Sequence, residues 1–159
     1  MGRPGPGMGV GAEPMTLEAR IEGKAKGLDR SRSSGHFRYD SENNRTNKAL
    51  IYMLMANKAE EKGVQLPIPP GLHGYHIEIT VLVAPRKRYT KKQLSLIAEG
   101  RCSPTGKPDL DNVAKLWLDG MKGIIEDDRF VTELCVSRRW SDHDAVVASL
   151  SWEPMPMEG

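Results

Sequence analysis

Alternation of apolar and polar residues predicts four β-strands along the chain. The clearest covers residues 75–83, and its alternating apolar positions are Tyr75, Ile77, Ile79, Val81 and Val83. Residues 16–22, 132–140 and 145–152 follow the same two-residue period, which places their apolar side chains on one face of a sheet. The last two segments are separated only by residues 141–144, which are rich in turn formers, so we expect them to form a β-hairpin.

Helical periodicity predicts two helices outside these strands. From about residue 46 to residue 62, apolar side chains recur at helical spacing, and Gly63 follows as a typical C-cap. A shorter helix is predicted over residues 90–99, with Thr90 as its N-cap and Gly100 after its end. Between the first strand and the first helix, residues 23–44 have the basic, Gly/Ser-rich composition of a loop.

A third helix is predicted from Asn112 to about Gly123, with Asp111 or Asn112 as its N-cap. Its apolar face consists of Val113, Leu116, Trp117, Gly120, Met121 and Ile124. Such a stripe is suited to burial against a sheet. The element order therefore predicts an α+β fold, in which helices pack on one face of a mixed β-sheet in two layers.

The length of 159 residues matches one domain, which we place at residues 15–153. Residues 1–14 contain five glycines and three prolines with little to bury, so we expect a disordered head. Residues 154–159 are expected to be a frayed tail.

Composition excludes several classes of protein. Two cysteines, Cys102 and Cys135, provide neither a disulfide framework nor zinc-ligand spacing, which favours a reducing compartment. No apolar run approaches the ~18–20 residues that cross a bilayer, and no secretory signal is visible. We therefore expect a cytoplasmic protein that does not associate with membranes.

Charge is unevenly distributed, although the formal net charge is only +2. Residues 86–92 hold five cations and no acid, and residues 20–48 hold eight cations against four acids. Clustered lysines and arginines bind the phosphate backbone of nucleic acids, although a run of charge can also be an ordinary solvated loop.

The densest chemistry lies in residues 107–115, Lys-Pro-Asp-Leu-Asp-Asn-Val-Ala-Lys, which we call the acidic motif. On the predicted helix, Asp111, Lys115 and Asp119 follow at four-residue intervals and share one face. A second acidic cluster follows at residues 126–128. Clustered carboxylates repel one another unless cations neutralise them, and Mg²⁺ binds a few carboxylates together with water or phosphate oxygens. The pattern indicates metal-dependent chemistry on a phosphate.

Each part of this pattern also has a simpler structural explanation. Asp109 could be only a capping residue, and Lys115 and Asp119 could be an ordinary i,i+4 ion pair. Asp127 and Asp128 could form a turn before the next strand. The order and spacing of all these residues together favour the functional interpretation.

Residues 107–112, then Lys115 and Asp119, then Asp127 and Asp128 before an alternating strand, resemble the signature of the RusA family of Holliday-junction resolvases. The close resemblance covers about residues 107–136. It implies that Asp109 and Asp111 are metal-binding aspartates and that Lys115 is the essential lysine. It places the third catalytic aspartate at Asp128, with Asp127 as the alternative metal ligand.

Members of this family are Mg²⁺-dependent endonucleases of bacteria and their phages, which act as homodimers on four-way DNA junctions. The resemblance therefore implies a homodimer, branched DNA as substrate and Mg²⁺ as cofactor, with Mn²⁺ as a possible substitute. The expected DNA-binding residues are Arg30, Arg32, Arg86, Lys87, Arg88 and Lys107.

Two alternatives remain open from the sequence. The first is a branched-DNA-binding protein without catalytic activity, although all the expected catalytic positions are filled. The second is another metal-dependent phosphotransfer enzyme that uses a DxD motif. A DxDxT phosphatase is disfavoured because Asn112 and Val113 follow Asp111 and the motif follows a polar loop.

Overall fold

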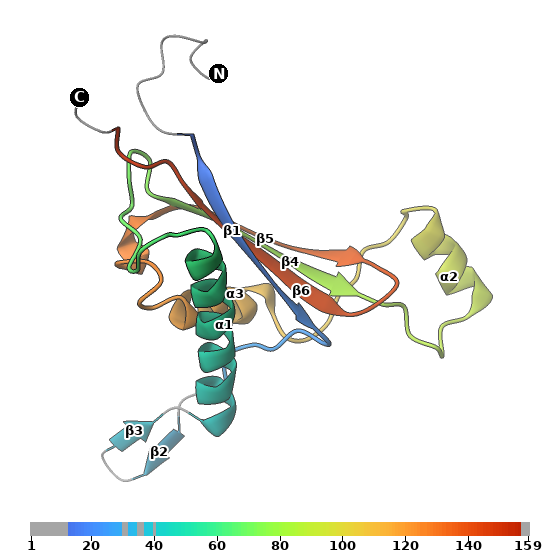
Figure 1. Ribbon diagram of the computed structural model, residues 1–159. Coiled ribbons are helices and arrows are strands. Elements are labelled where there is room, and N and C mark those ends of the chain that lie inside the picture. The colour runs from blue at the N-terminus through green and yellow to red at the C-terminus, as the bar shows by residue number, and fades with distance from the viewer. Residues whose placement is uncertain (1–12, 30–31, 35–36, 40, 157–159) are drawn as a thin grey trace.

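The computed structural model describes residues 13–29, 32–34, 37–39 and 41–156 (Figure 1). Most of the expected disordered head and the last three residues of the expected frayed tail lie outside this range. No helix within it is long and apolar enough to cross a membrane.

Four strands form the main sheet, in the order β1-β6-β4-β5. Their bounds are β1 Met15–Glu22, β4 Tyr75–Val83, β5 Val131–Trp140 and β6 Ala145–Trp152. β6 is antiparallel to both β1 and β4, whereas β5 is parallel to β4. The sheet is therefore mixed, as the sequence predicts, and each predicted strand is present to within one residue.

The predicted hairpin between the last two strands is wrong, because β4 lies between β5 and β6. Four residues can span about 13 Å, whereas strands two places apart in a sheet are only about 10 Å apart. Residues 141–144, which we call the crossing loop, therefore pass over the end of β4. Ser141 N–H donates to Val83 O at 2.9 Å, and Ala84 N–H donates to the Asp144 carboxylate at 2.9 Å.

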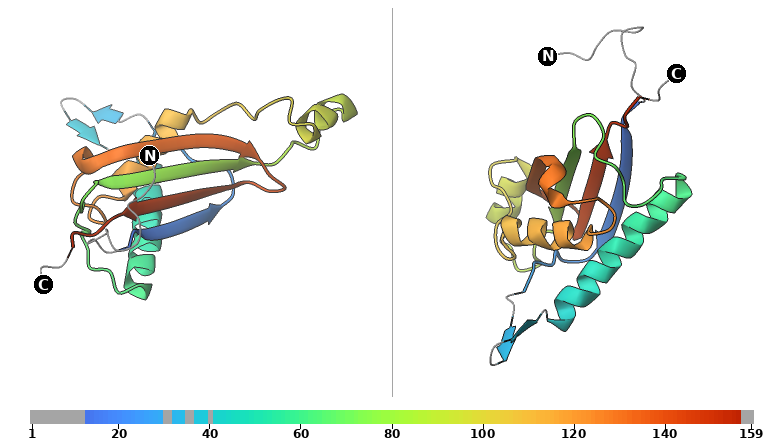
Figure 2. Two further views of the ribbon diagram at one scale, coloured as in Figure 1. Left: turned by 90° about the horizontal axis from the view of Figure 1, so that it is seen from above. Right: turned by 90° about the vertical axis from the view of Figure 1, so that its left-hand side faces the viewer.

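Two helices cover one face of this sheet (Figure 2). α1 spans Glu42–Glu61 and begins at Ser41, whose hydroxyl accepts from Asn44 N–H, so it starts four residues before the predicted boundary. α3 spans Leu110–Gly120. It begins two residues before the predicted start and ends before Gly123, and Asp109, not Asp111 or Asn112, occupies the N-cap position.

The third helix, α2 (Lys91–Ala98), is present where the sequence predicts it, and Thr90 and Gln93 form a capping box. It does not lie on the sheet face with α1 and α3. Figure 1 shows it beyond one end of the sheet, and none of its residues is buried. The two-layer arrangement therefore applies to α1 and α3, whereas α2 is an outlying arm.

The core lies between the sheet and the pair α1 and α3. Its fully buried side chains include Leu17, Ile51, Met55, Ile79, Trp117, Met121 and Leu150. The loop predicted between β1 and α1 also contains a small two-stranded sheet, β2 (Arg32–Ser34) and β3 (Phe37–Tyr39). A short 3₁₀-helix, η1 (Asp128–Phe130), precedes β5.

Candidate active site

The acidic motif lies at the start of α3. Asp109 has extended backbone angles at the N-cap position, but its carboxylate makes no capping hydrogen bond. Asp111 lies in the first turn of the helix, and both side chains are exposed. The carboxylate of Asp109 is therefore not used for capping, and both residues lie at the N-terminal, positive end of the helix dipole.

Lys115 lies on the same face as Asp111, one turn further along α3. Its Nζ is 3.8 Å from Asp111 Oδ2, and 61% and 70% of the two side chains are exposed. Asp119 has a different environment, because its carboxylate lies 3.7 Å from Lys48 on α1 and 3.9 Å from Lys122. Asp119 thus links α3 to α1, while Asp111 and Lys115 face solvent as a pair.

The second acidic cluster surrounds η1. Asp127 is the N-cap, and its carboxylate accepts from Arg129 N–H at 2.9 Å. This hydrogen bond holds the pKa of Asp127 below its ordinary value. Asp128 is exposed, and the preceding Glu126 N–H donates to the hydroxyl of the buried Tyr75 at 3.0 Å. Burial raises the pKa of this phenol.

The two acidic clusters lie at opposite ends of α3. The helix has eleven residues and so rises about 16 Å from the acidic motif towards η1. Along β5, Val131 next to η1 and Arg138 next to the motif are about 23 Å apart at ~3.3 Å per residue. Mg²⁺–oxygen bonds are only about 2 Å long. Accordingly, within the described part of the chain no three His, Cys, Asp or Glu side chains are arranged to hold one metal ion.

The structure therefore pairs Asp111 with Lys115 and places Asp109 at the N-cap of the same helix, whereas Asp127 and Asp128 lie elsewhere in the same chain. The sequence pattern could not indicate this, because residues 121–127 could lead the chain in either direction. Met121, Ile124 and Ile125 are buried. Ile68 N–H donates to Ile124 O at 2.8 Å, which directs the segment towards the start of β4.

A basic groove of about 700 Å³ adjoins the acidic motif. Its cationic lining residues are Lys24, Arg86, Lys87, Arg88, Lys107 and Arg138. Among its lining residues in the described part of the chain, Asp144 is the only carboxylate, and it accepts a hydrogen bond from Ala84 N–H. Four of the six predicted DNA-binding residues therefore line one groove. Arg30 lies outside the described residues, and for Arg32 on β2 only the backbone is described.

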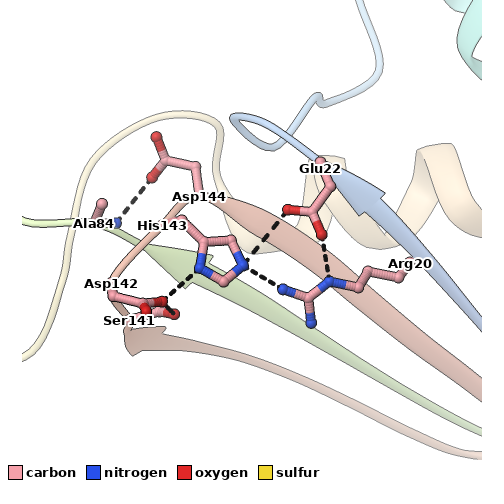
Figure 3. A network of polar contacts seen from close by, with 7 residues as sticks. All are labelled: Arg20, Glu22, Ala84, Ser141, Asp142, His143 and Asp144. Carbon is pink, nitrogen blue, oxygen red and sulfur yellow. Dashed lines mark hydrogen bonds and ion pairs between the residues drawn. The ribbon is translucent and has the colours of Figure 1, made fainter.

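The crossing loop holds two of the segments that form this groove. Figure 3 shows Asp144 bonded to the backbone of Ala84, which leads directly into Arg86. The carbonyl of Asp144 also accepts from Gly23 N–H at 2.9 Å, immediately before Lys24. The ends of β1 and β4, which are distant in sequence, are thus tied to the same loop.

A polar network surrounds this junction (Figure 3). His143 Nδ1 lies 2.5 Å from Asp142 Oδ1, and its Nε2 lies 3.5 Å from Glu22 and also contacts Arg20. The hydrogen bond from Arg20 Nε, at 2.6 Å, is the main cause of a lowered pKa of Glu22. The bond from His143 similarly lowers the pKa of Asp142. The network links β1 to the crossing loop by charge.

Arg138 is a candidate that the sequence analysis missed. Its guanidinium donates to the carbonyl of Gly106 at 2.7 Å and to the carbonyl of Pro108, directly before Asp109. Val136, Arg138 and Trp140 lie on the face of the sheet that the helices cover. An arginine among the apolar residues of this face was the sequence signal that could have identified Arg138 as a candidate.

The segment after β1 approaches the motif from the other side. Leu28 N–H donates to Asn112 O at 3.2 Å. A Cβ on Gly27 would lie 2.8 Å from Pro108 Cβ and 3.1 Å from Asn112 Cβ. The absence of a side chain at Gly27 therefore permits this close contact. Lys24, in the same segment, lines the basic groove.

Comparison with known proteins gives one family. A family model described as endodeoxyribonuclease RusA matches residues 21–150, which is most of the chain. The match covers the acidic motif, the second acidic cluster and the basic groove. No curated protein matches the chain.

Proposed function

This chain belongs to the RusA family of endodeoxyribonucleases, which resolve Holliday junctions. We propose that it resolves four-way DNA junctions by paired symmetric nicking and that its active site lies at the start of α3. The observation that supports this proposal is the position of Asp109, Asp111 and Lys115 next to the basic groove. Cations that bind the DNA backbone adjoin carboxylates that hold a metal at one phosphate. The family assignment favours this function over the other phosphotransfer enzymes that contain a DxD motif.

The donor set at the motif fits Mg²⁺. This ion is usually held by one or two carboxylates together with substrate phosphate oxygens and water, and Asp109 and Asp111 supply two exposed carboxylates. Mn²⁺, which binds similar oxygen ligands, is the expected substitute. When bound, the metal supplies a nucleophile near neutral pH and stabilises charge on the phosphate.

The side chains around the motif have separate roles in this proposal. Lys115, 3.8 Å from Asp111, is placed to neutralise charge that develops on the attacked phosphate. Arg86, Lys87 and Lys107 bind the adjacent backbone phosphates in the basic groove. Arg138 holds the loop before Asp109 and so orients that carboxylate.

A third carboxylate would come from the partner subunit of a homodimer. Asp128 cannot reach Asp111 of its own chain, because α3 separates them by about 16 Å. A twofold axis perpendicular to α3 and β5, and beside them, would make these elements antiparallel to their copies in the partner subunit. It would bring the η1 cluster of each chain to the motif of the other, since an isologous interface is self-complementary. Such a dimer also carries two sites, which matches the two symmetric cuts that resolve a junction.

The experiment that tests this function compares a labelled four-way junction with a linear duplex of the same sequence, in Mg²⁺ and in EDTA. We expect paired nicks in the junction alone and no cleavage in EDTA. Asp111→Asn and Lys115→Ala should each lower the cleavage rate by about a hundredfold or more, because the first removes a metal-binding charge and the second removes a cation that acts on the transition state. Both variants should retain junction binding, since the backbone contacts lie in the groove.

Asp119→Asn is the matched control, because it makes the same chemical change two turns further along α3, where the carboxylate pairs with Lys48 and Lys122. We expect it to cleave like the wild type. Cleavage at the wild-type rate by Asp111→Asn would refute the assignment of the site. Tight junction binding without cleavage in any divalent metal would instead support a DNA-binding protein without catalytic activity.

A further inference from the structure

A second pocket, of about 280 Å³, lies between the α2 arm and the end of the sheet. Its walls are formed by Tyr89 and Trp140, by Leu96 and Ile97 of α2, and by Cys102 and Ser103 of the loop between α2 and α3. Its volume is near the lower end of the ~300–1,000 Å³ that is usual for small-ligand sites. The pocket combines aromatic and aliphatic walls with a polar rim.

The aromatic walls have fixed positions. Tyr89 and Trp140 pack edge to face, with ring centroids 6.3 Å apart and an interplanar angle of 86°. The indole N–H of Trp140 donates to Cys102 O at 3.0 Å, which fixes the orientation of the indole ring. Trp140 is only partly buried, so the ring retains accessible surface. A flat ligand could therefore stack on a surface that is already oriented.

These apolar side chains do not belong to the main core. No residue of α2 is buried, and the core cluster of the described residues contains neither Tyr89 nor Trp140. Figures 1 and 2 show α2 standing beyond the end of the sheet, connected to it by two loops. An arm without a core of its own leaves the aromatic pair available for binding.

The pocket continues into the basic groove. Thr105 lines both. Tyr89 directly follows Arg88, and Trp140 lies two residues after Arg138 on the same face of β5. If the phosphates of a bound polymer lie among the cations of the groove, a side group attached to the next unit of its backbone would therefore lie near the aromatic walls. In DNA that side group is a nucleobase.

We propose that this pocket receives one unpaired nucleobase from the DNA strand whose phosphates lie in the basic groove. Bases released from the helical stack bind to aromatic side chains by stacking, which every base permits because each has a π-face. At a four-way junction, the bases at the branch point lose less stacking and pairing free energy than other bases when they leave the helical stack. The inference rests on the proposed function, because it names how the same site recognises the branch point.

The test measures junction affinity by fluorescence anisotropy in EDTA, where no cleavage occurs. The intact four-way junction is compared with one that carries abasic nucleotides at the branch point. Four single variants of the full chain are used. Trp140→Ala removes the stacking surface, Trp140→Phe retains a ring, and Ser103→Leu narrows the pocket without touching the aromatic pair. Leu94→Ala is the matched control, because Leu94 is a 43% exposed residue of α2 that does not line the pocket.

The wild type should bind the abasic junction about tenfold more weakly, within the range that stacking of one base contributes. Trp140→Ala and Ser103→Leu should weaken binding to the intact junction to a similar extent and cause no further loss on the abasic junction. Trp140→Phe and Leu94→Ala should bind both DNAs like the wild type. Ser103→Leu decides the question if Trp140→Ala proves to be unfolded in a thermal melt.

An intrinsic fluorescence titration gives an independent readout. Trp117 and Trp152 are 2% and 5% exposed, so quenching by DNA reports on Trp140. We expect the intact junction to quench the emission more strongly than the abasic one.

If Trp140→Ala and Ser103→Leu lost the same affinity for the abasic junction as for the intact one, the proposal would be overturned. The pocket would then only support α2. Unchanged affinity of Ser103→Leu for the intact junction would likewise overturn the proposal. Failure of the proposed function is distinguishable: in that case the wild type would neither prefer the junction to a duplex nor cut it in Mg²⁺, whatever these variants do.

Discussion

Arg138 stabilises the backbone from which Asp109 projects. It is an inward-facing arginine on an edge strand, and it donates to two carbonyls of the loop before Asp109. It also lines the basic groove, so its charge and its hydrogen bonds can affect different properties. In the proposed function the charge would contribute to DNA binding, whereas the hydrogen bonds would position the carboxylate of Asp109.

Replacement of Arg138 should separate these properties. In Arg138→Lys the charge remains but the fixed fork of donors is lost, so we expect junction affinity to be retained and the Mg²⁺ concentration for half-maximal cleavage to rise about tenfold. Arg138→Ala should lose both affinity and cleavage. The measurement is a Mg²⁺ titration of the cleavage rate at saturating junction, with Arg139→Lys as the control. An unchanged Mg²⁺ dependence in Arg138→Ala would show that the arginine only binds DNA.

The pKa of Glu22 gives a second prediction for single residues. The hydrogen bond from Arg20 lowers this pKa, so the native state favours the ionised carboxylate. The resulting stability is present above the ordinary pKa of a glutamate and is lost as the pH falls through the lower native value. Arg20→Gln should therefore raise the pKa of Glu22 towards its ordinary value, as measured by NMR titration of the side-chain carboxyl. A pKa that does not move would mean that Arg20 is not the cause.

The candidate residues differ in how far the sequence could predict them. Asp111 and Lys115 were predictable as neighbours because a four-residue interval on a helix fixes their relative positions. The basic run at residues 86–88 was visible from charge alone, and the structure places it in the basic groove. Arg138 was not predictable, because its role depends on where the loop before Asp109 passes. That path is set by packing between segments that are far apart in the sequence.

At the scale of elements, the contact between α1 and α3 sets the position of the acidic motif. Gly120 lies against Ile51, and a Cβ on this glycine would be 2.7 Å from Ile51 Cβ and Cγ2. Ile51 is 1% exposed and cannot move outwards. The two helices therefore approach as closely as they do because residue 120 has no side chain.

Gly120→Ala should destabilise the fold by about 1–3 kcal/mol, because overpacking in a core outweighs the gain in helix propensity. The loss in the double variant Gly120→Ala with Ile51→Ala should be smaller than the sum of the two single losses, since Ile51 Cγ2 and Cδ1, which crowd the new Cβ together with Ile51 Cβ, are removed. Urea unfolding of the single and double variants measures the coupling. Additive effects would show that the two residues do not limit the helix spacing.

The sequence predicted where the elements lie along the chain better than it predicted which elements lie next to one another in space. Alternation located β4, β5 and β6 because a half-buried strand needs one apolar face. It could not show that the crossing loop passes over β4, since a hairpin and a one-strand crossing are both possible with four residues. The position of α2 beyond the sheet was equally invisible, because its amphipathic pattern is the same as that of a helix that packs on a sheet.

At the scale of the molecule, a mixed dimer tests the proposal that two chains share each site. One chain carries Asp111→Asn and the other Asp128→Asn, and the heterodimer is isolated through two different affinity tags. With shared sites, one site receives both changes and the other receives neither, so we expect one nick per junction. With sites inside each chain, both would be damaged and no cleavage would occur. Both homodimers should be inactive, and the wild-type heterodimer with the same tags is the control.

The parallel neighbours β4 and β5 also have a thermodynamic consequence. Residues 84–130, which connect them, carry the pocket beside α2, the acidic motif and η1. The two strands thus hold both ends of one long excursion, and ordering that excursion opposes their pairing through loop-closure entropy. A ligand that orders residues 84–130 therefore also stabilises the centre of the sheet, by linkage. Substrate and metal act in this view as parts of the fold.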